Sequence, residues 1–259
     1  MHERLSFFIK RDSPIHRLNP MTKVVLAFSL VLIAFTSPWY WTPLAIFIFV
    51  IIPLTVIGKV APEYWSFFFK VILPTVLFLF VMQALFLPGE SKVVFQIVGL
   101  EITELSIRLA FRNASRITVM VSSFTIMLLT THPSELMSDL TRRGLPGQFA
   151  YVIISSLQII PQMQAKAQTI ISAQRSRGLD TQGSFIKRAG SLVPLLGPLV
   201  FGSLVEVEER AIAIEARGFT STKAKTSLHE IPDTSLDRTM RWTLAALVII
   251  SLALRLWLL

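Results

Sequence analysis

The sequence predicts an all-α integral membrane protein, on the grounds of its apolar composition, its low charge and its long apolar runs. Hydrophobic residues make up 53% of the 259 residues, charged residues only 16%, and the mean hydropathy is +0.61. A soluble domain carries charge on about a quarter of its residues, whereas apolar runs of this length are typical of membrane helices. We expect about five transmembrane helices, with three cytoplasmic helices between the fourth and the fifth.

The basic net charge and the absence of cysteine argue against several kinds of function. The formal net charge is +9, and the chain has no cysteine. Disulfides, thiol catalysis and cysteine-based metal sites are therefore excluded. Basic cytoplasmic loops explain the charge better than a nucleic-acid partner does, so we expect the lipid bilayer, and no nucleic acid, as a partner. Residues 1–20 are polar and basic, which argues against a cleavable signal peptide.

The first 130 residues are expected to hold about four spans. Apolar runs at 24–36 and 44–57 are short for perpendicular crossings, since about 20 residues span the hydrocarbon core. They predict a tight helical hairpin, either tilted or with its tip in the interface, and the aromatic residues of 37–43 suit such a tip. The clearest single span is 64–87, in which Pro74 predicts a kink.

The fourth span, at about 109–129, begins with three arginines on one helix face. Arg108, Arg112 and Arg116 are spaced i, i+4, i+8. The preceding connection, 88–107, is expected to lie outside the cell, so these cations depart from the positive-inside rule. We favour snorkelling to headgroups or pairing with Glu101 and Glu104. A role facing a partner is the alternative.

The basic residues predict the orientation. Thirteen of the 25 lie between residues 130 and 241, and 20 of the 25 fall on the same side once the N-terminal ones, Lys59 and Lys70 are added. The positive-inside rule then places the N-terminus, including residues 1–21, in the cytoplasm. The predicted organisation is a transmembrane region at 1–130, a cytoplasmic or interfacial region at 131–241, and a C-terminal transmembrane helix at 242–259.

Three helices are predicted in the cytoplasmic region. The first begins at Pro133, with Glu135 in its first turn, and ends at Arg143-Gly144. The second runs from about 148 to 177 and the third from about 184 to 217. Both long helices are apolar nearly all round in their first half and amphipathic afterwards; in the second helix the change comes at Pro161. Residues 220–236 are polar and are expected to form a linker to the last span.

The two long helices end in the same seven-residue pattern, Ala-x-x-small-Arg-Gly-apolar. The copies are residues 173–179 and 213–219, and their arginines, Arg177 and Arg217, lie 40 positions apart. A glycine after a helix supplies the left-handed cap, and a cation in the last turn contributes about 0.3–1 kcal/mol. One Arg-Gly pair is therefore explained by capping alone, as at Arg143-Gly144.

Capping does not account for the duplication of the longer phrase. It requires neither the alanine nor the small residue, Ser176 or Ala216, that precedes each arginine. A guanidinium on an exposed helix end can form bidentate bonds with carboxylates and carbonyls of a partner, and small neighbours let that partner approach. The pair of ends therefore indicates docking to a partner with two similar sites.

At these motifs the sequence resembles the transmembrane (T) component of energy-coupling factor transporters, the vitamin and transition-metal uptake systems of prokaryotes. The resemblance covers nearly the whole chain. It rests on His16-x-Leu18-x-Pro20-x-Thr22-Lys23, Thr130-Thr131-x-Pro133-x-Glu135-Leu136, Gly144-Leu145-Pro146, Ile160-Pro161, Ser176-Arg177-Gly178 and Ala216-Arg217-Gly218. The first copy of the paired motif has serine, not alanine, before its arginine.

The resemblance implies an α-helical scaffold in a prokaryotic cytoplasmic membrane that has no catalytic residue and binds no cofactor or metal itself. Two ABC-type ATPase subunits would bind the ATP, and a small membrane-embedded S component would bind the vitamin or metal ion. The apolar halves, 151–160 and 192–205, would form the platform for the S component. The ATPase-docking residues would be Ser176, Arg177, Gly178, Ala216, Arg217 and Gly218. Helix-entry or interface candidates are Pro133, Glu135, Arg143, Gly144 and Pro161.

Two other classes of protein fit the sequence less well. The histidines of the chain have no His-x-x-x-His spacing, and there is no Gly-x-Ser-x-Gly or phosphate-binding loop, which argues against an enzyme. His16 and His132 lie at helix entries and are better explained as capping or interface residues. A self-contained ABC permease subunit or a small channel would need polar residues on several spans. Here they cluster on one span, at Asn113, Ser115, Thr118 and Ser122–Ser123.

Overall fold

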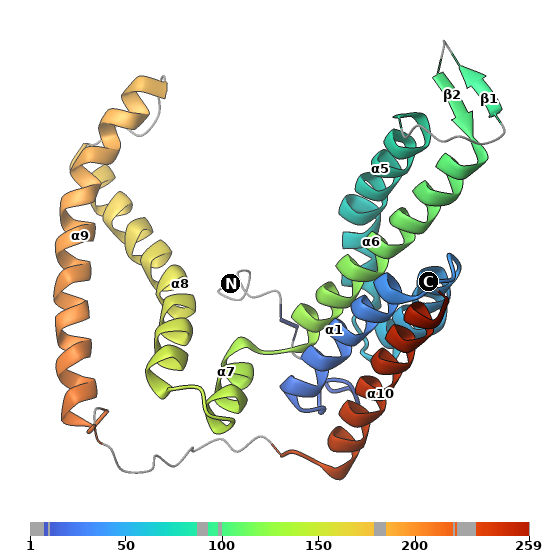
Figure 1. The fold of residues 1–259 in the computed structure, drawn as a ribbon. Helices are drawn as coiled ribbons and strands as arrows, with labels where there is room; N and C mark the ends of the chain where they lie inside the picture. The colour runs from blue at the N-terminus through green and yellow to red at the C-terminus, as the bar shows by residue number, and fades with distance from the viewer. Residues whose placement is uncertain are drawn as a thin grey trace. The chain divides into compact units, whose positions relative to one another are not determined.

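The computed structural model describes residues 8–9, 11–86, 93–97, 100–178, 185–219, 221 and 232–258. Within them the chain is predominantly helical, which confirms the all-α class (Figure 1). The chain divides into two compact units. The larger unit consists of 6–144 and 231–259, and the smaller one falls within 145–230.

The larger unit has helices at each predicted span and one small β-hairpin. Two of its helical segments are composite: α2, η1 and α3 form one, and α4, η2 and α5 form the other. The elements are α1 (Pro20–Thr36), α2 (Thr42–Ile46), η1 (Phe47–Ile51), α3 (Ile52–Ile57), α4 (Ala61–Phe67), η2 (Phe68–Ile72), α5 (Leu73–Phe86), β1 (Val93–Ile97), β2 (Leu100–Thr103), α6 (Glu104–Thr130), α7 (Pro133–Arg142) and α10 (Ser235–Leu258).

Both composite segments contain a π-helical turn shortly before a proline. In η1 the Ile52 N–H bonds to the Phe47 carbonyl, and Pro53 follows; η2 precedes Pro74 in the same way. Proline lacks an N–H and clashes with the carbonyl four residues earlier. A wider turn before the proline relieves that clash, since π-turns are a recognised way to disturb a helix locally. The predicted irregularity at Pro74 is thus present as a π-turn.

Length and composition distinguish the candidate membrane spans. Among the described residues, Ala61–Phe86 and Ser235–Trp257 are long and apolar enough to cross a bilayer, and α6 qualifies together with α7, which bends away from it by 90°. Pro20–Thr36 and Thr42–Ile57 are apolar but shorter. The count of five spans, and the way the first hairpin meets the membrane, stay predictions.

Helix α6 is the centre of the larger unit, with α5 on one side and α1 on the other, while α10 lies along α1 (Figure 1). Polar side chains on these helices bond to one another. The fully buried Tyr64 donates its hydroxyl to Ser122 Oγ at 2.7 Å. Asn113 Nδ2 donates to Gln83 Oε1 at 3.1 Å and joins α6 to α5.

A buried lysine binds the C-terminal end of α6. Lys23 is only 3% exposed, and its Nζ donates to the carbonyl oxygens of Thr130 at 2.8 Å and of His16 at 3.1 Å. Thr130 is the last residue of α6, whose final carbonyls have no partner within the helix and carry partial negative charge. Lys23 therefore satisfies a helix end from the neighbouring helix.

The last helix begins earlier than predicted. The expected span was 242–258 after a polar linker at 220–236, whereas α10 begins at Ser235. Thr234 and Asp237 form a reciprocal cap: Thr234 N donates to Asp237 Oδ2 at 3.2 Å, and Asp237 N donates to Thr234 Oγ1 at 3.3 Å. This cap starts the helix at a polar position. Most of the predicted linker, 220 and 222–231, lies outside the described residues.

The connection between α5 and α6 contains an antiparallel β-hairpin that was not predicted. Strand β1 pairs with β2, and the register shifts between Val93 and Phe95. Thr103 then caps α6, because its Oγ1 accepts from Ser106 N at 3.2 Å. The alternation in these short strands is too brief to distinguish a strand from a loop by pattern alone.

The smaller unit is a pair of long helices, α8 (Gly147–Ser176) and α9 (Phe185–Ala216). Their bounds agree with the predicted helices at 148–177 and 184–217 to within a residue at each end. Helix α8 continues through Pro161 without a break.

Replacing Lys23 with methionine should destabilise the larger unit by about 1–3 kcal/mol, because two buried carbonyls lose their hydrogen-bond donor. Thermal unfolding of the full chain in mild detergent measures the effect. Lys70→Met is the matched control, since Lys70 is an exposed lysine on η2. Equal unfolding temperatures for the two variants would contradict the assigned role of Lys23.

Candidate functional site

All three Arg-Gly pairs end a helix with a left-handed glycine, as predicted. The φ angles are +114° at Gly144, +89° at Gly178 and +72° at Gly218, a region that side chains with a Cβ rarely adopt. At the end of α9 the Phe219 N–H bonds to Ile214 O at 3.1 Å and the Gly218 N–H to Glu215 O at 2.9 Å. This is the bond pattern of a Schellman cap.

The arginines before these glycines differ in their surroundings. Arg143 Nε donates to Asp139 Oδ2 at 2.7 Å, and its Nη2 lies 3.5 Å from Asp233 Oδ2. Arg177 and Arg217 are exposed, and within the described part of the chain neither guanidinium has a hydrogen bond or an ion pair. The repeated pair therefore presents unpaired cations, whereas the third arginine is used in packing.

Helices α8 and α9 run antiparallel (Figure 1), and side-chain contacts join residues near their middles, where the two helices cross. Ser203 Oγ lies 3.3 Å from Met163 Sδ, and Lys166 Nζ lies 3.4 Å from Glu206 Oε2. A Cβ at Gly202 would meet Lys166 Nζ at 2.9 Å, so this glycine lets the lysine lie against α9. These contacts fix the crossing.

The antiparallel arrangement separates the two unpaired arginines. The ring of Phe219, just beyond Arg217, lies 5.2 Å from the ring of Tyr151 in the first turns of α8, whereas Arg177 is at the opposite end of α8. At 1.5 Å per residue, the 26 residues from Tyr151 to Arg177 correspond to about 40 Å. The two Arg-Gly ends thus lie at opposite ends of the pair.

The contacts at the crossing share the spacing of the sequence repeat. They join Met163 to Ser203 and Lys166 to Glu206, each 40 positions apart. Arg177 and Arg217 are separated by the same 40 positions. Corresponding positions of the two helices therefore meet at the crossing. The sequence repeat has a geometric counterpart that periodicity alone did not reveal.

The predicted apolar halves do not lie side by side along their whole length. Because the helices are antiparallel, 151–160 packs toward the end of α9, and 192–205 toward the end of α8; they approach each other only at the crossing. Both halves expose large apolar side chains within the described residues. Those at least 40% exposed are Val152, Ile153, Leu157, Ile160, Leu196, Val200, Phe201, Leu204 and Val205. Apolar exposure on this scale is typical of surfaces covered by lipid or protein.

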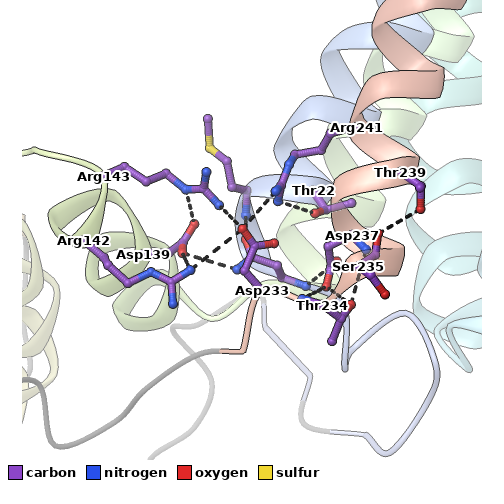
Figure 2. A network of polar contacts seen from close by, with 12 residues as sticks. Thr22, Asp139, Arg142, Arg143, Asp233, Thr234, Ser235, Asp237, Thr239 and Arg241 are labelled. Atoms are coloured by element: carbon purple, nitrogen blue, oxygen red, sulfur yellow. Dashed lines mark hydrogen bonds and ion pairs between the residues drawn. The ribbon is translucent and has the colours of Figure 1, made fainter.

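An ion network lies where the chain leaves the larger unit and returns to it (Figure 2). Asp233 Oδ2 lies 2.9 Å from Arg241 Nη2 and 3.5 Å from Arg143 Nη2, so the segment before α10 is tied to the end of α7. The hydrogen bond from Arg241 holds the pKa of the Asp233 carboxyl below its ordinary value. Gly144 follows this network at the exit, and Asp233 precedes α10 at the return.

Asn19 connects this network to the start of α1. It is fully buried; its Nδ2 donates to Asp139 Oδ1 at 3.3 Å, and its backbone N–H donates to Asp237 Oδ1 at 3.0 Å. Its own Oδ1 accepts from Met21 N at 2.9 Å and caps α1. The N-terminal turns of α1 and α10 therefore meet the middle of α7 in one buried polar cluster. By these contacts α7 and the start of α10 pack with the larger unit, although the predicted region 131–241 includes both.

Most of the other predicted residues also lie at helix ends. Pro133 opens α7 with Glu135 in its first turn, and His132 caps it by accepting from Ser134 N at 3.2 Å. This confirms the predicted capping role of His132. Pro161 lies inside α8, near the crossing. Functional roles for these residues stay predictions.

Sequence reasoning did not single out Asn19, Asp139, Asp233 and Asp237. Local signals for two of them exist: asparagine before proline is a helix start, and Thr234-x-x-Asp237 resembles a capping box. No local pattern could show that Asn19 bonds to Asp237, which is 218 positions away.

Comparison with known proteins gives consistent matches along the chain. A family model described as cobalt transport protein, CbiQ, matches residues 11–228. The energy-coupling factor transporter transmembrane protein EcfT of Leuconostoc gelidum subsp. gasicomitatum is 31% identical over 264 residues, covering 97% of this chain and 96% of the relative. The protein of the same name from Bacillus subtilis is 29% identical over 262 residues, with 96% of each chain covered.

Replacing Asp139 with alanine should cost about 3 kcal/mol of stability, because Arg143 and the Asn19 amide lose a buried partner. The exposed pair Asp12–Arg17 provides the control, since Arg17 also binds its carboxylate within 3.0 Å. Asp12→Ala should cost less than about 1 kcal/mol. Chemical or thermal unfolding of both variants tests the contrast, and equal costs would refute the importance of the cluster.

The folded chain should lose stability in mild acid because His16, in the N-terminal segment, becomes protonated. Its Nε2 donates to Ile9 O at 2.9 Å and its Nδ1 lies 2.7 Å from Ser13 Oγ, while burial lowers its pKa below 6.5. The folded chain therefore binds this proton less readily than the unfolded chain, and stability falls as the pH drops below 6.5. Unfolding temperatures at pH 7.5 and 5.5 should differ more for the wild type than for His16→Asn. The same difference in both proteins would contradict this assignment.

Proposed function

The chain belongs to the cobalt transport protein (CbiQ) family as the transmembrane component of an energy-coupling factor transporter, and on this premise we propose that it is the coupling scaffold of an ATP-driven importer. It links two ABC-type ATPase subunits to a small membrane-embedded S component. The ATPase subunits bind and hydrolyse ATP, and this chain performs no catalysis. The S component binds the cargo, a vitamin or a transition-metal ion.

The observation that carries the proposal is the pair of exposed arginines at opposite ends of the α8–α9 pair, neither of which has a partner among the described residues. Each follows a small residue, Ser176 or Ala216, and is held by a glycine cap. A guanidinium on such a rigid end can bind carboxylates or carbonyls in bidentate geometry. Two like sites about 40 Å apart suit a pair of similar ATPase subunits, one at each end.

The exposed apolar side chains of α8 and α9 support a second interface. An S component embedded in the membrane offers apolar surface of its own, and association within the bilayer would depend on close packing of the two surfaces. Around the crossing, the apolar halves at 151–160 and 192–205 come within reach of a single partner. Toward the ends they diverge, so the platform is centred on the crossing.

Polar contacts within the larger unit favour this scaffold over a self-contained permease or channel. A pore needs polar side chains on its spans, and the polar cluster on α6 is the set of residues that could supply them. Asn113 bonds to Gln83, Ser122 to Tyr64, and Thr118 to the Ala114 carbonyl. These three groups are bonded within the helix packing, which leaves them poorly suited to coordinate a passing solute. Ser123 Oγ is the exception, since it is buried without a partner among the described residues.

The orientation proposed for the chain has the N-terminus and the α8–α9 pair on the cytoplasmic side of a prokaryotic membrane. The ATPase subunits are then on the side where ATP is available. The distribution of Lys and Arg supports this orientation, and cysteine-labelling from each side of the membrane would test it directly, since the chain has no native cysteine.

Arg177→Glu and Arg217→Glu should each weaken ATPase binding by about 2 kcal/mol, roughly 30-fold, because a charge-assisted contact becomes a repulsion. Each single variant retains one docking end, whereas the double variant should lose both ATPase co-purification and substrate uptake. The measurements are pull-down of the ATPase subunits from membranes and transport in reconstituted vesicles.

Two controls separate docking from helix capping. Arg238→Glu reverses an exposed arginine on α10 and should leave ATPase binding unchanged. Arg143→Glu should lower the thermal stability of the chain, because Arg143 lies in the ion network. If the double variant keeps wild-type ATPase binding and uptake, the docking proposal fails.

A further inference from the structure

Four arginines gather at the C-terminal end of α1, away from the polar cluster that holds its N-terminus. Arg108, Arg112 and Arg116 come from successive turns of α6, and Arg255 comes from α10. Thr36 Oγ1 and Ser251 Oγ lie 2.8 Å apart, which brings α10 against the end of α1 one turn before Arg255. We call these four residues the arginine cluster.

Two members of the cluster bind the same helix end. Arg116 Nε donates to Ala34 O at 3.1 Å and its Nη2 donates to Phe35 O at 2.9 Å. Arg255 Nη1 also donates to Phe35 O, at 3.3 Å. The last carbonyls of α1 carry partial negative charge and attract cations. The partial negative charge of these carbonyls is smaller than the combined positive charge of the Arg116 and Arg255 guanidinium groups, which share the Phe35 carbonyl as an acceptor.

The remaining two members leave the cluster with excess positive charge. Arg108 pairs with Glu104 at 2.8 Å, the one carboxylate that forms an ion pair with the cluster among the described side chains. Arg112 lies one turn from both Arg108 and Arg116 on the same face of α6. Its Nε is buried and has no hydrogen-bond partner in the described region. Like charges this close repel, and a buried donor without a partner costs free energy.

Aromatic residues place the cluster at the level of a membrane interface. Trp39 and Trp41 are 67% and 55% exposed, and Trp257 on α10 is 83% exposed. The Arg108 guanidinium lies 5.6 Å from the centre of the Tyr40 ring. Exposed tryptophan and tyrosine are typical of the headgroup region of a bilayer, where lipid phosphates also lie.

We propose that the arginine cluster binds the phosphate group of an anionic phospholipid, which offsets the repulsion of Arg112 with Arg108 and Arg116 on the same helix face. A phosphodiester supplies the negative charge and the acceptor oxygens that the described residues do not, and arginine binds phosphate in bidentate geometry. The exposed tryptophans then lie beside the acyl chains. A lipid is favoured over a free anion because the cluster is surrounded by apolar and aromatic surface. With the orientation proposed above, the lipid belongs to the outer leaflet.

The test is lipid titration of the delipidated full chain in mild detergent, followed by the shift in unfolding temperature. Phosphatidylglycerol should raise the unfolding temperature more than phosphatidylcholine does, and sodium phosphate should not raise it. Arg112→Gln should raise the concentration of phosphatidylglycerol for half the effect about tenfold, as expected for one charged hydrogen bond. Without lipid, the same variant should unfold at the wild-type temperature or above it, because repulsion in the cluster is reduced.

Arg238→Gln is the matched control, since it removes one exposed arginine from the other end of α10 and should leave the titration within twofold of the wild type. An Arg112→Gln chain that titrates like the wild type would overturn the proposal. Equal stabilisation by sodium phosphate would reassign the cluster to a free anion. Loss of the S component from the Arg112→Gln complex, with an unchanged lipid titration, would reassign it to a protein partner. None of these outcomes depends on ATPase docking at Arg177 or Arg217.

Discussion

The larger unit depends on how its buried helix starts are satisfied. Asn19 caps α1 with its side chain, donates its amide to Asp139 on α7, and gives its backbone N–H to Asp237 on α10. Buried polar groups are tolerated only when they are bonded. Three segments from distant parts of the sequence are therefore held in one arrangement, because moving any of them would leave a buried donor or carboxylate without a partner.

The same ion network brings together the two places where the chain passes between the larger unit and the smaller one. The chain leaves the larger unit after Gly144 and returns before Asp233, and Arg143 and Asp233 both belong to the network. The larger unit therefore holds both of its own ends of this connection, whereas Arg177 and Arg217 have no partner among the described residues. Arg143-Gly144 and Arg177-Gly178 have the same dipeptide and cap geometry, and they differ in whether the guanidinium has a partner.

The sequence predicted the helical class, the bounds of α7, α8 and α9, and the glycine caps, because these follow from local pattern and backbone preference. It predicted Arg177 and Arg217 as a pair through their shared phrase. It could not predict where the two helices cross, since the crossing depends on contacts such as Lys166 with Glu206 that connect separate helices. The early start of α10 was missed for a related reason: its cap at Thr234 and Asp237 lies in a polar stretch that hydropathy assigns to a linker.

The position of the crossing determines how the pair can transmit force. Met163 and Ser203 meet there, and Arg177 and Arg217 follow them by 14 residues each, so the crossing has two equal lever arms of about 21 Å. Equal and opposite forces across the helices at the two arginines cancel as a translation and add as a torque. A partner that moves the two ends in opposite directions would therefore twist the crossing without displacing it sideways.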